Sequence, residues 1–160
     1  MGKTFGFIGC GNMGGALAKA VSEAGYKNDI LLADINKERV ETLGQEISAE
    51  PADAQKIAQE CKFIFIGVKP QMIAECFSEI KDALNKREDK PVIVSMAAGV
   101  AVSRIKELSG VDSVIRIMPN MPVSVGSGVV LATAENVSEA NKACFENAMS
   151  KAGIFDWLEE

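Results

Sequence analysis

Short apolar runs alternate along the chain with segments whose apolar residues recur at helical spacing. The runs predict strands at residues 4–8, 29–33, 63–68, 92–94, 114–117, 129–132 and 154–157, with a weaker strand around Ile47. Between them lie amphipathic stripes, such as the i, i+4, i+7, i+11 series Ile73, Phe77, Ile80 and Leu84. Strands that alternate with helices are typical of an α/β protein with a parallel sheet. We therefore expect one α/β domain over residues 1–160, with a doubly wound, mainly parallel sheet and helices on both faces.

Polar and glycine residues mark the predicted ends of several elements. Gly25 is expected to end the first helix, and Asn36 is expected to cap a second helix that runs to Gly44. Ser103 and Ser138 are candidate N-caps of later helices. Two prolines in the segment Met118-Pro119-Asn120-Met121-Pro122 are expected to end a strand and form a rigid turn.

Composition narrows the possible partners. With 160 residues, 48% of them apolar, the chain can form one sizeable core, and its net charge of −5 disfavours nucleic acid and anionic membranes. No apolar run approaches the roughly 20 residues that span a bilayer, and no signal peptide opens the chain. These features predict a cytoplasmic protein with a small-molecule partner.

The residue types also exclude several kinds of catalytic site. Histidine is absent, so the chain holds no imidazole base, Ser-His-Asp site or histidine-containing zinc site. The four cysteines, Cys10, Cys61, Cys76 and Cys144, are widely spaced and are expected to be free, mostly buried thiols. No cluster with metal-ligand spacing is present in the sequence, and we expect no metal.

A glycine motif, Gly9-Cys10-Gly11-Asn12-Met13-Gly14, follows the first predicted strand and opens a helix. In this context Gly9 permits a tight turn, Gly11 lets the backbone approach a pyrophosphate, and Gly14 lets helix and strand pack closely. The helix N-terminus then offers free amides and a partial positive charge to the phosphates. The motif predicts a Rossmann-type domain that binds a dinucleotide, NADP(H) or NAD(H).

An acid closes the second predicted strand. Asp34 lies about 20 residues after the motif, where a carboxylate can accept hydrogen bonds from the adenosine ribose. This placement favours NAD(H), because a carboxylate repels a 2′-phosphate. Asn36, Lys37 and Arg39 could instead turn toward a phosphate, or could only cap and solvate the next helix.

Three further segments follow strands at the edge where open α/β sheets bind ligands. Lys69 could steady a phosphate or the nicotinamide ribose, or the Lys-Pro pair could simply end the strand. The small residues at 97–99 could form a wall for a flat ring or only a compact turn. Asn120 could bind a carboxamide or a substrate polar group, or serve as a turn former.

Taken together, these segments resemble the N-terminal, cofactor-binding domain of pyrroline-5-carboxylate reductase. The matching segments are Phe7 to Gly14, Val68-Lys69-Pro70-Gln71, Ser95 to Val100, and Arg116 to Pro122 with Val125-Gly126-Ser127-Gly128. The glycine motif is common to many dehydrogenases, whereas the other three in this order are far more specific. The resemblance covers essentially the whole chain.

The resemblance implies hydride transfer from NADPH or NADH to the imine of 1-pyrroline-5-carboxylate, giving L-proline in proline biosynthesis. The expected cofactor-binding residues are Ile8, Gly9, Cys10, Gly11, Asn12, Met13, Gly14, Asp34, Asn36, Lys37, Val68, Lys69, Pro70, Ala97, Ala98 and Gly99. Those expected to border the substrate are Met118, Pro119 and Asn120.

Two departures from the family pattern qualify this expectation. Members often carry Ser or Arg after the second strand to hold the 2′-phosphate, whereas this chain has Asp34-Ile35, which puts the usual NADPH preference in doubt. The family also continues into a helical C-terminal domain that forms a homo-oligomer and supplies much of the imino-acid pocket. We therefore expect these 160 residues to bind cofactor but to turn over little or no substrate alone.

Two other hypotheses about the function remain open. One is another NAD(P)-dependent oxidoreductase, of the hydroxyisobutyrate dehydrogenase or deazaflavin-dependent NADP reductase type. The other is a non-catalytic nucleotide-sensing module, because a fold alone does not determine function.

Overall fold

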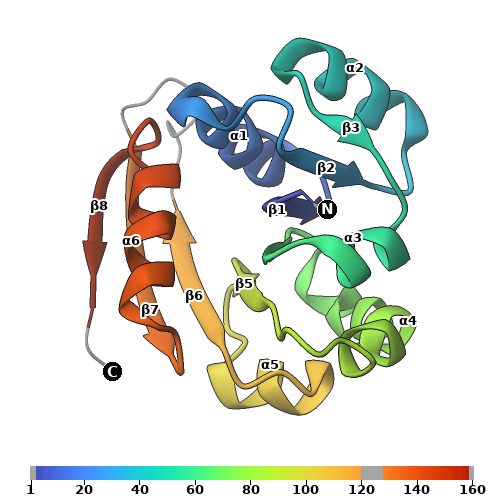
Figure 1. Ribbon diagram of the computed structural model, residues 1–160, viewed down its shortest axis with the longest axis vertical. Coiled ribbons are helices and arrows are strands. Elements are labelled where there is room, and N and C mark those ends of the chain that lie inside the picture. The colour runs from blue at the N-terminus through green and yellow to red at the C-terminus, as the bar shows by residue number, and fades with distance from the viewer. Residues whose placement is uncertain (1–2, 120–127, 159–160) are drawn as a thin grey trace.

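The computed structural model describes residues 3–119 and 128–158, which form one sheet with helices on both faces (Figure 1). The strand order is β3-β2-β1-β4-β5-β6-β7-β8, and every neighbouring pair is parallel except β6 and β7. The strands are β1 (Phe5–Ile8), β2 (Ile30–Ala33), β3 (Glu50–Pro51), β4 (Phe63–Ile66), β5 (Val92–Ser95), β6 (Val114–Pro119), β7 (Gly128–Glu135) and β8 (Gly153–Trp157). The predicted Rossmann-type, mainly parallel α/β fold is confirmed.

Helices cover the two faces in separate sets. On one face lie α1 (Asn12–Val21), α2 (Lys37–Ile47) and α6 (Glu139–Ala148); on the other lie α3 (Ala54–Glu60), α4 (Ile73–Asn85) and α5 (Val102–Ser109). A π-helical turn, η1 (Ser22–Tyr26), extends α1, and a 3-10 turn, η2 (Pro70–Met72), precedes α4. Within the described residues, no helix is long and apolar enough to cross a bilayer.

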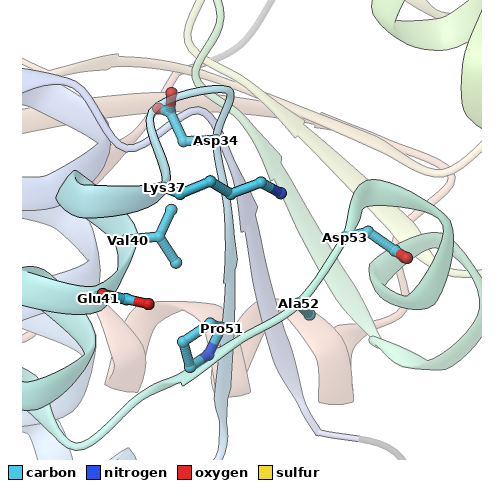
Figure 2. A pocket seen from close by; sticks show the side chains of 7 residues that line it. All are labelled: Asp34, Lys37, Val40, Glu41, Pro51, Ala52 and Asp53. Carbon is cyan, nitrogen blue, oxygen red and sulfur yellow. The ribbon is translucent and has the colours of Figure 1, made fainter.

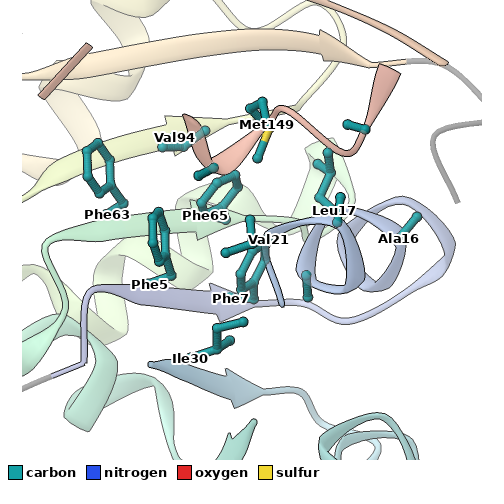
Figure 3. Close-up of a cluster of buried hydrophobic side chains, with 14 of the residues drawn as sticks. Phe5, Phe7, Ala16, Leu17, Val21, Ile30, Phe63, Phe65, Val94 and Met149 are labelled. Carbon is teal, nitrogen blue, oxygen red and sulfur yellow. The ribbon is translucent and has the colours of Figure 1, made fainter. Parts of the chain in front are cut away.

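Alternating side chains of the central strands build a separate core on each face. Phe5 and Phe7 of β1 point into the first core, where Phe7 stacks on Phe65 with ring centroids 4.3 Å apart (Figure 3). Phe145 of α6 joins this cluster, 5.8 Å from the Phe65 ring. Ile8 points the other way, into the second core. This two-sided burial explains why the run at 63–66 is continuously apolar.

The predicted N-caps Asn36 and Ser138 are confirmed, because their side chains accept the backbone N–H groups of Arg39 and Asn141. The cap predicted at Ser103 is wrong: α5 begins after Ala101, and Ser103 lies inside its first turn. Proximity to the helix start, which is all that sequence shows, does not distinguish a cap from a first-turn residue.

The end of the second helix and the position of the weak third strand differ from expectation. The second helix runs past Gly44 to Ile47, because the missing side chain of Gly44 makes room for the Ala49 carbonyl, 2.8 Å from where a Cβ would lie. Ile47 is therefore a buried helical residue, and the weak third strand is Glu50–Pro51 instead. The first α-helix ends at Val21 but continues as a π-helical turn, and the helical backbone stops at Gly25, as expected, where φ is +108°.

The strand before the proline-rich segment is longer than predicted. Met118 and Pro119 still belong to β6, where they lie opposite Leu131 and Val130 of β7. Because β5 pairs with β6 only as far as Arg116, Pro119 borders a strand on one side alone. A proline, which lacks an N–H, is tolerated at such an edge. Asn120 lies outside the described residues.

Candidate functional site

The glycine loop lies where the sheet order changes direction. From β1 the chain moves to β2 and β3 on one side, while β4 lies on the other side of β1. In open α/β sheets the crevice beyond the carboxyl ends of the strands at such a switch point is the ligand site. The loop from Gly9 to Gly11 joins β1 to α1 at this edge.

Three glycines bring β1, α1 and β4 into close contact. Gly9 has φ +98°, and a Cβ there would lie 2.6 Å from the carbonyl carbon of Gly67. A Cβ at Gly67 would lie 2.7 Å from the Gly9 oxygen, and one at Gly14 would also collide with that oxygen. The Gly67 N–H donates to Ile8 O at 2.7 Å. Gly9 and Gly14 thus have the expected structural roles in the turn and in helix–strand packing. Gly67 is a third glycine that this close contact requires, and the sequence analysis did not identify it. Its signal was an isolated glycine at the end of an apolar strand.

Gly11 differs from these three, because a Cβ there would meet no atom within 4 Å. It is the N-cap residue of α1, and no side chain caps this helix. Packing within the protein therefore does not require a glycine at this position. Open space beside an uncapped helix N-terminus fits a phosphate group that approaches the backbone.

Side chains of the motif do not all face this space. Ile8 and Cys10 are buried in the cores, and Met13 packs against the first core, so these residues can present only backbone to a ligand. Asn12 is exposed at the start of α1. Burial, followed by the negative charge of Asp34, raises the pKa of the Cys10 thiol to about 12, so this thiol is neutral at physiological pH.

Asp34 and Arg39 hold the Cys10 peptide from two directions. The Cys10 N–H donates to the Asp34 carboxylate at 2.6 Å, and Arg39 Nε donates to the Cys10 carbonyl at 2.8 Å. The other Asp34 oxygen accepts the Asn36 N–H at 3.0 Å. The loop after β2 thus braces the glycine loop. Sequence reasoning placed Asp34 near a ribose but did not find this bracing role, which joins residues more than 20 positions apart.

Two cavities flank this region. One, of about 330 Å³, lies at the carboxyl ends of β2 and β3, and Figure 2 shows Lys37 extending across it toward the α3 side that carries Asp53. Its lining residues are Asp34, Lys37, Val40, Glu41, Pro51, Ala52 and Asp53. A second, of about 240 Å³, lies between α1 and α2 and includes Asn12, Lys19 and Arg39. Lys37 and Arg39 therefore border different cavities on either side of α2.

The remaining predicted residues that the structure describes lie at or just after the ends of three adjacent strands. Because Ile66 pairs with Ser95 and Ser95 with Arg116, the segments that follow β4 and β5 and the end of β6 lie along one edge. Lys69 and Pro70 are exposed there, while Val68 packs against the second core.

The segment after β5 can present mainly backbone atoms to a ligand. Ala97 is buried, and Ala98 and Gly99 are exposed. The Ala97 N–H donates to the buried Ser95 hydroxyl at 3.3 Å, which shapes the turn.

At the end of β6, Met118 is exposed and Pro119 half-buried. Across residues 3–119 and 128–158, no group of three or more Cys, Asp or Glu side chains is placed to hold a metal ion.

Known proteins resemble this chain in sequence. It is 31% identical over 157 residues to the pyrroline-5-carboxylate reductase of Aquifex aeolicus, covering 97% of this chain and 57% of that protein. It is 36% identical over 137 residues to the Escherichia coli enzyme of that name, covering 83% and 50% of the two chains. The chain thus spans about half the length of the curated relatives it matches.

Solved structures agree. A pyrroline-5-carboxylate reductase from Coxiella burnetii superimposes with a TM-score of 0.90 at 25% identity, over 100% of this chain and 60% of that one. The Plasmodium falciparum pyrroline carboxylate reductase, solved with NADP bound, has a TM-score of 0.84 at 23% identity, over 99% and 58%. The resemblance to this group of enzymes is confirmed. A family profile described as "NADP oxidoreductase coenzyme F420-dependent" also matches residues 4–99, more than half of the chain. The chain therefore belongs to this NADP oxidoreductase family and is a relative of the pyrroline-5-carboxylate reductases.

Proposed function

We propose that this chain is the dinucleotide-binding part of a pyrroline-5-carboxylate reductase, which reduces 1-pyrroline-5-carboxylate to L-proline. The observation that carries the proposal is Gly11, whose missing side chain opens space beside an uncapped helix N-terminus. The similarity in sequence to reductases of this name, over most of the chain, supplies the substrate class.

The chain's own residues would bind and orient the cofactor. The first-turn amides of α1 would donate to the pyrophosphate, and the Asp34 and Arg39 contacts would hold the loop rigid before cofactor arrives. When bound, NADPH or NADH supplies the hydride. The small residues at 97–99 would let the nicotinamide ring lie close to the backbone after β5, with Lys69 on its other side.

Asp34 would also decide between the two cofactors. Its carboxylate oxygens each accept one backbone N–H and keep further lone pairs for ribose hydroxyls. A 2′-phosphate at the same place would meet a like charge, which Lys37 and Arg39 offset only in part. We expect a preference for NADH over NADPH, in contrast to the NADP in the family description.

The substrate would lie beyond the nicotinamide, next to Met118 and Pro119 at the end of β6. We propose that the rest of the imino-acid pocket, the proton donor and the homo-oligomer contacts come from the part of the relatives that this chain does not span. The 160-residue chain should then bind dinucleotide without reducing substrate.

The test is a calorimetric titration of the chain with NADH and NADPH, together with an assay of pyrroline-5-carboxylate-dependent NAD(P)H oxidation. Saturable dinucleotide binding without turnover is expected. Absence of binding would overturn the cofactor assignment. Rapid turnover by the chain alone would overturn the proposal that the rest of the imino-acid pocket and the proton donor lie outside these 160 residues.

A second candidate is an F420-dependent NADP reductase, because the family description names that deazaflavin. The matches to reductases of pyrroline-5-carboxylate cover 83% and 97% of the chain, and these favour the first candidate. Fluorescence titration with F420 distinguishes the two, since only the second function requires a deazaflavin site.

A further inference from the structure

The two edges of the sheet differ in how they are protected against pairing with another strand. At one edge, β3 consists only of Glu50 and Pro51. A very short strand with a charge and a proline is a common way to prevent another chain from adding to an edge. At the other edge, β8 has five residues without a proline, and its only charged residue is Asp156. The chain thus protects one edge and leaves the other available.

Figure 1 shows β8 as the outermost strand, and no strand within residues 3–119 and 128–158 pairs with its outer side. The interior strands β1, β2, β4 and β5 are buried at every residue, whereas each residue of β8 is half-buried or exposed. Ile154 is 69% exposed, although it is a large apolar side chain. The edge at β8 therefore has both backbone and apolar surface that a further strand could cover.

The register of β7 and β8 determines which backbone groups of β8 face outward. The Leu158 N–H donates to the Ala132 carbonyl of β7 at 2.7 Å. Because alternate residues of a strand bond to the same neighbour, β8 bonds to β7 through its even-numbered residues. The N–H and C=O groups of Phe155 and Trp157 therefore point away from β7. A row of such groups at an edge is a template for another strand.

The side chains of the same two residues fix β8 against α6. The Phe155 ring lies 5.8 Å from the Phe145 ring and 5.0 Å from the Trp157 ring, measured between centroids. The Trp157 indole N–H also donates to Glu146 of α6. These contacts lie on one face of the sheet and leave the outer edge uncovered. A strand that is already ordered loses little conformational entropy when it pairs.

We propose that β8 is a contact between two copies of this chain, which pair antiparallel about a two-fold axis at Phe155. The two sheets then join into one continuous sheet, and the same residues contribute from both copies. This contact does not depend on the reductase function. It is separate from the homo-oligomer contacts proposed above for the rest of the relatives' length.

The sequence of β8 is complementary to itself in this register. With Phe155 opposite Phe155 of the second copy, all five residues of the strand are paired. Trp157 then lies opposite Gly153, where the absence of a side chain leaves room for the indole ring. Aromatic side chains cover glycines at strand edges in this way. The register therefore gives the one large indole of each copy a glycine to lie on.

Charge favours the same register. Ile154 lies opposite Asp156 of the second copy, so the two acids of the dimer are diagonal to each other and not directly opposed. A two-fold axis at Asp156 would place like charges directly opposite each other, which is destabilising. An axis at Ile154 would pair only three of the five residues. The axis at Phe155 alone combines full overlap with separated acids.

Sedimentation velocity of the 160-residue chain at fixed ionic strength is the first test. A five-residue edge is smaller than a standard protein interface, so we expect a monomer–dimer equilibrium that depends on concentration. The measurement covers concentrations from about 10 μM to about 1 mM, the range of weak association. A chain that stays monomeric throughout overturns the proposal.

Charge variants test the register. Ile154→Asp places a carboxylate opposite Asp156 of the second copy, twice in each dimer, and should raise Kd at least about tenfold. The double variant Ile154→Asp/Asp156→Lys gives each new carboxylate an ammonium group opposite it and should restore Kd to within about threefold of the wild type. Ile35→Asp is the matched control, because it adds the same charge at an isoleucine that is 99% exposed near the other edge. It should leave Kd unchanged.

Amide hydrogen exchange by NMR gives a second measurement that needs no variant. The Phe155 N–H faces the outer edge, so its exchange should slow at least about tenfold at concentrations well above Kd. The Asp156 N–H, which bonds to β7 by the same alternation, is protected in the monomer too and should change less. If the chain dimerises while Phe155 exchange is unaffected, or if Ile154→Asp dimerises as the wild type does, another surface carries the contact and the proposal is overturned.

Discussion

Changing each of two glycines in the candidate site to alanine should have different effects: Gly67→Ala should mainly lower stability, and Gly11→Ala should mainly lower dinucleotide affinity. In Gly67→Ala the new Cβ would lie 2.7 Å from the Gly9 carbonyl oxygen, about 0.7 Å inside the 3.4 Å at which ordinary contact begins. The opposing atom is backbone and cannot rotate away, so β1 and β4 must separate. Overpacking of this kind costs about 1–3 kcal/mol.

Gly11→Ala is the matched control, because its Cβ meets no atom within 4 Å and its φ of −68° suits any residue. Its folding cost should stay below about 1 kcal/mol, the modest difference between glycine and alanine at an N-cap. The same methyl group, however, fills the space over the α1 N-terminus. We expect dinucleotide affinity to fall at least about tenfold, equivalent to about 1.4 kcal/mol.

Differential scanning fluorimetry measures the first effect, and calorimetric titration with NADH and NADPH measures the second. Each kcal/mol should lower Tm by roughly 2–4 °C in a chain of this size. Gly67→Ala should therefore melt lower yet retain more affinity than Gly11→Ala at a temperature where both are folded. An unchanged Tm in Gly67→Ala would refute the tight contact of Gly67 with Gly9. Wild-type affinity in Gly11→Ala would refute the proposal that a phosphate occupies the space beside Gly11 at the N-terminus of α1.

Three other predictions follow from the same structure. Asp34→Ser should raise NADPH affinity relative to NADH, because it removes a charge that repels the 2′-phosphate; an unchanged ratio in fluorescence titrations contradicts this. Phe145→Ala should destabilise the fold by about 3–5 kcal/mol, since this ring lies fully buried in the first core, and urea unfolding measures the loss. Burial raises the pKa of Cys10 and Cys61 to about 12 and that of Cys76 to about 11, above the usual value of 9.0. Thiols in the unfolded chain therefore ionise first, so the free energy of unfolding should be insensitive to these groups below about pH 9 and fall as pH rises toward 12. Urea midpoints measured over that range check the sign.

Several features of the site were predictable from sequence because the residues involved are close together in the chain. The strand, the glycine turn and the first helix occupy residues 5–21 without a break, so local spacing alone indicated the loop and its N-terminal helix. The strict alternation of strands and helices likewise indicated a parallel sheet, because parallel neighbours need a crossover. Side-chain caps at Asn36 and Ser138 depend on contacts three residues apart, and these were predicted correctly.

Contacts between distant segments were decided only by the tertiary structure. Gly67 packs on Gly9 and Arg39 reaches the Cys10 carbonyl, and in each case the partners lie more than 25 positions apart. The register of β6 and β7, which places Arg116 opposite Thr133, was likewise decided only by the tertiary structure. Residue types and periodicity determine which elements form, but they do not specify strand register. Because register sets which side chains become neighbours, the bracing of the glycine loop and the placement of Arg116 opposite Thr133 appear only once the sheet is assembled.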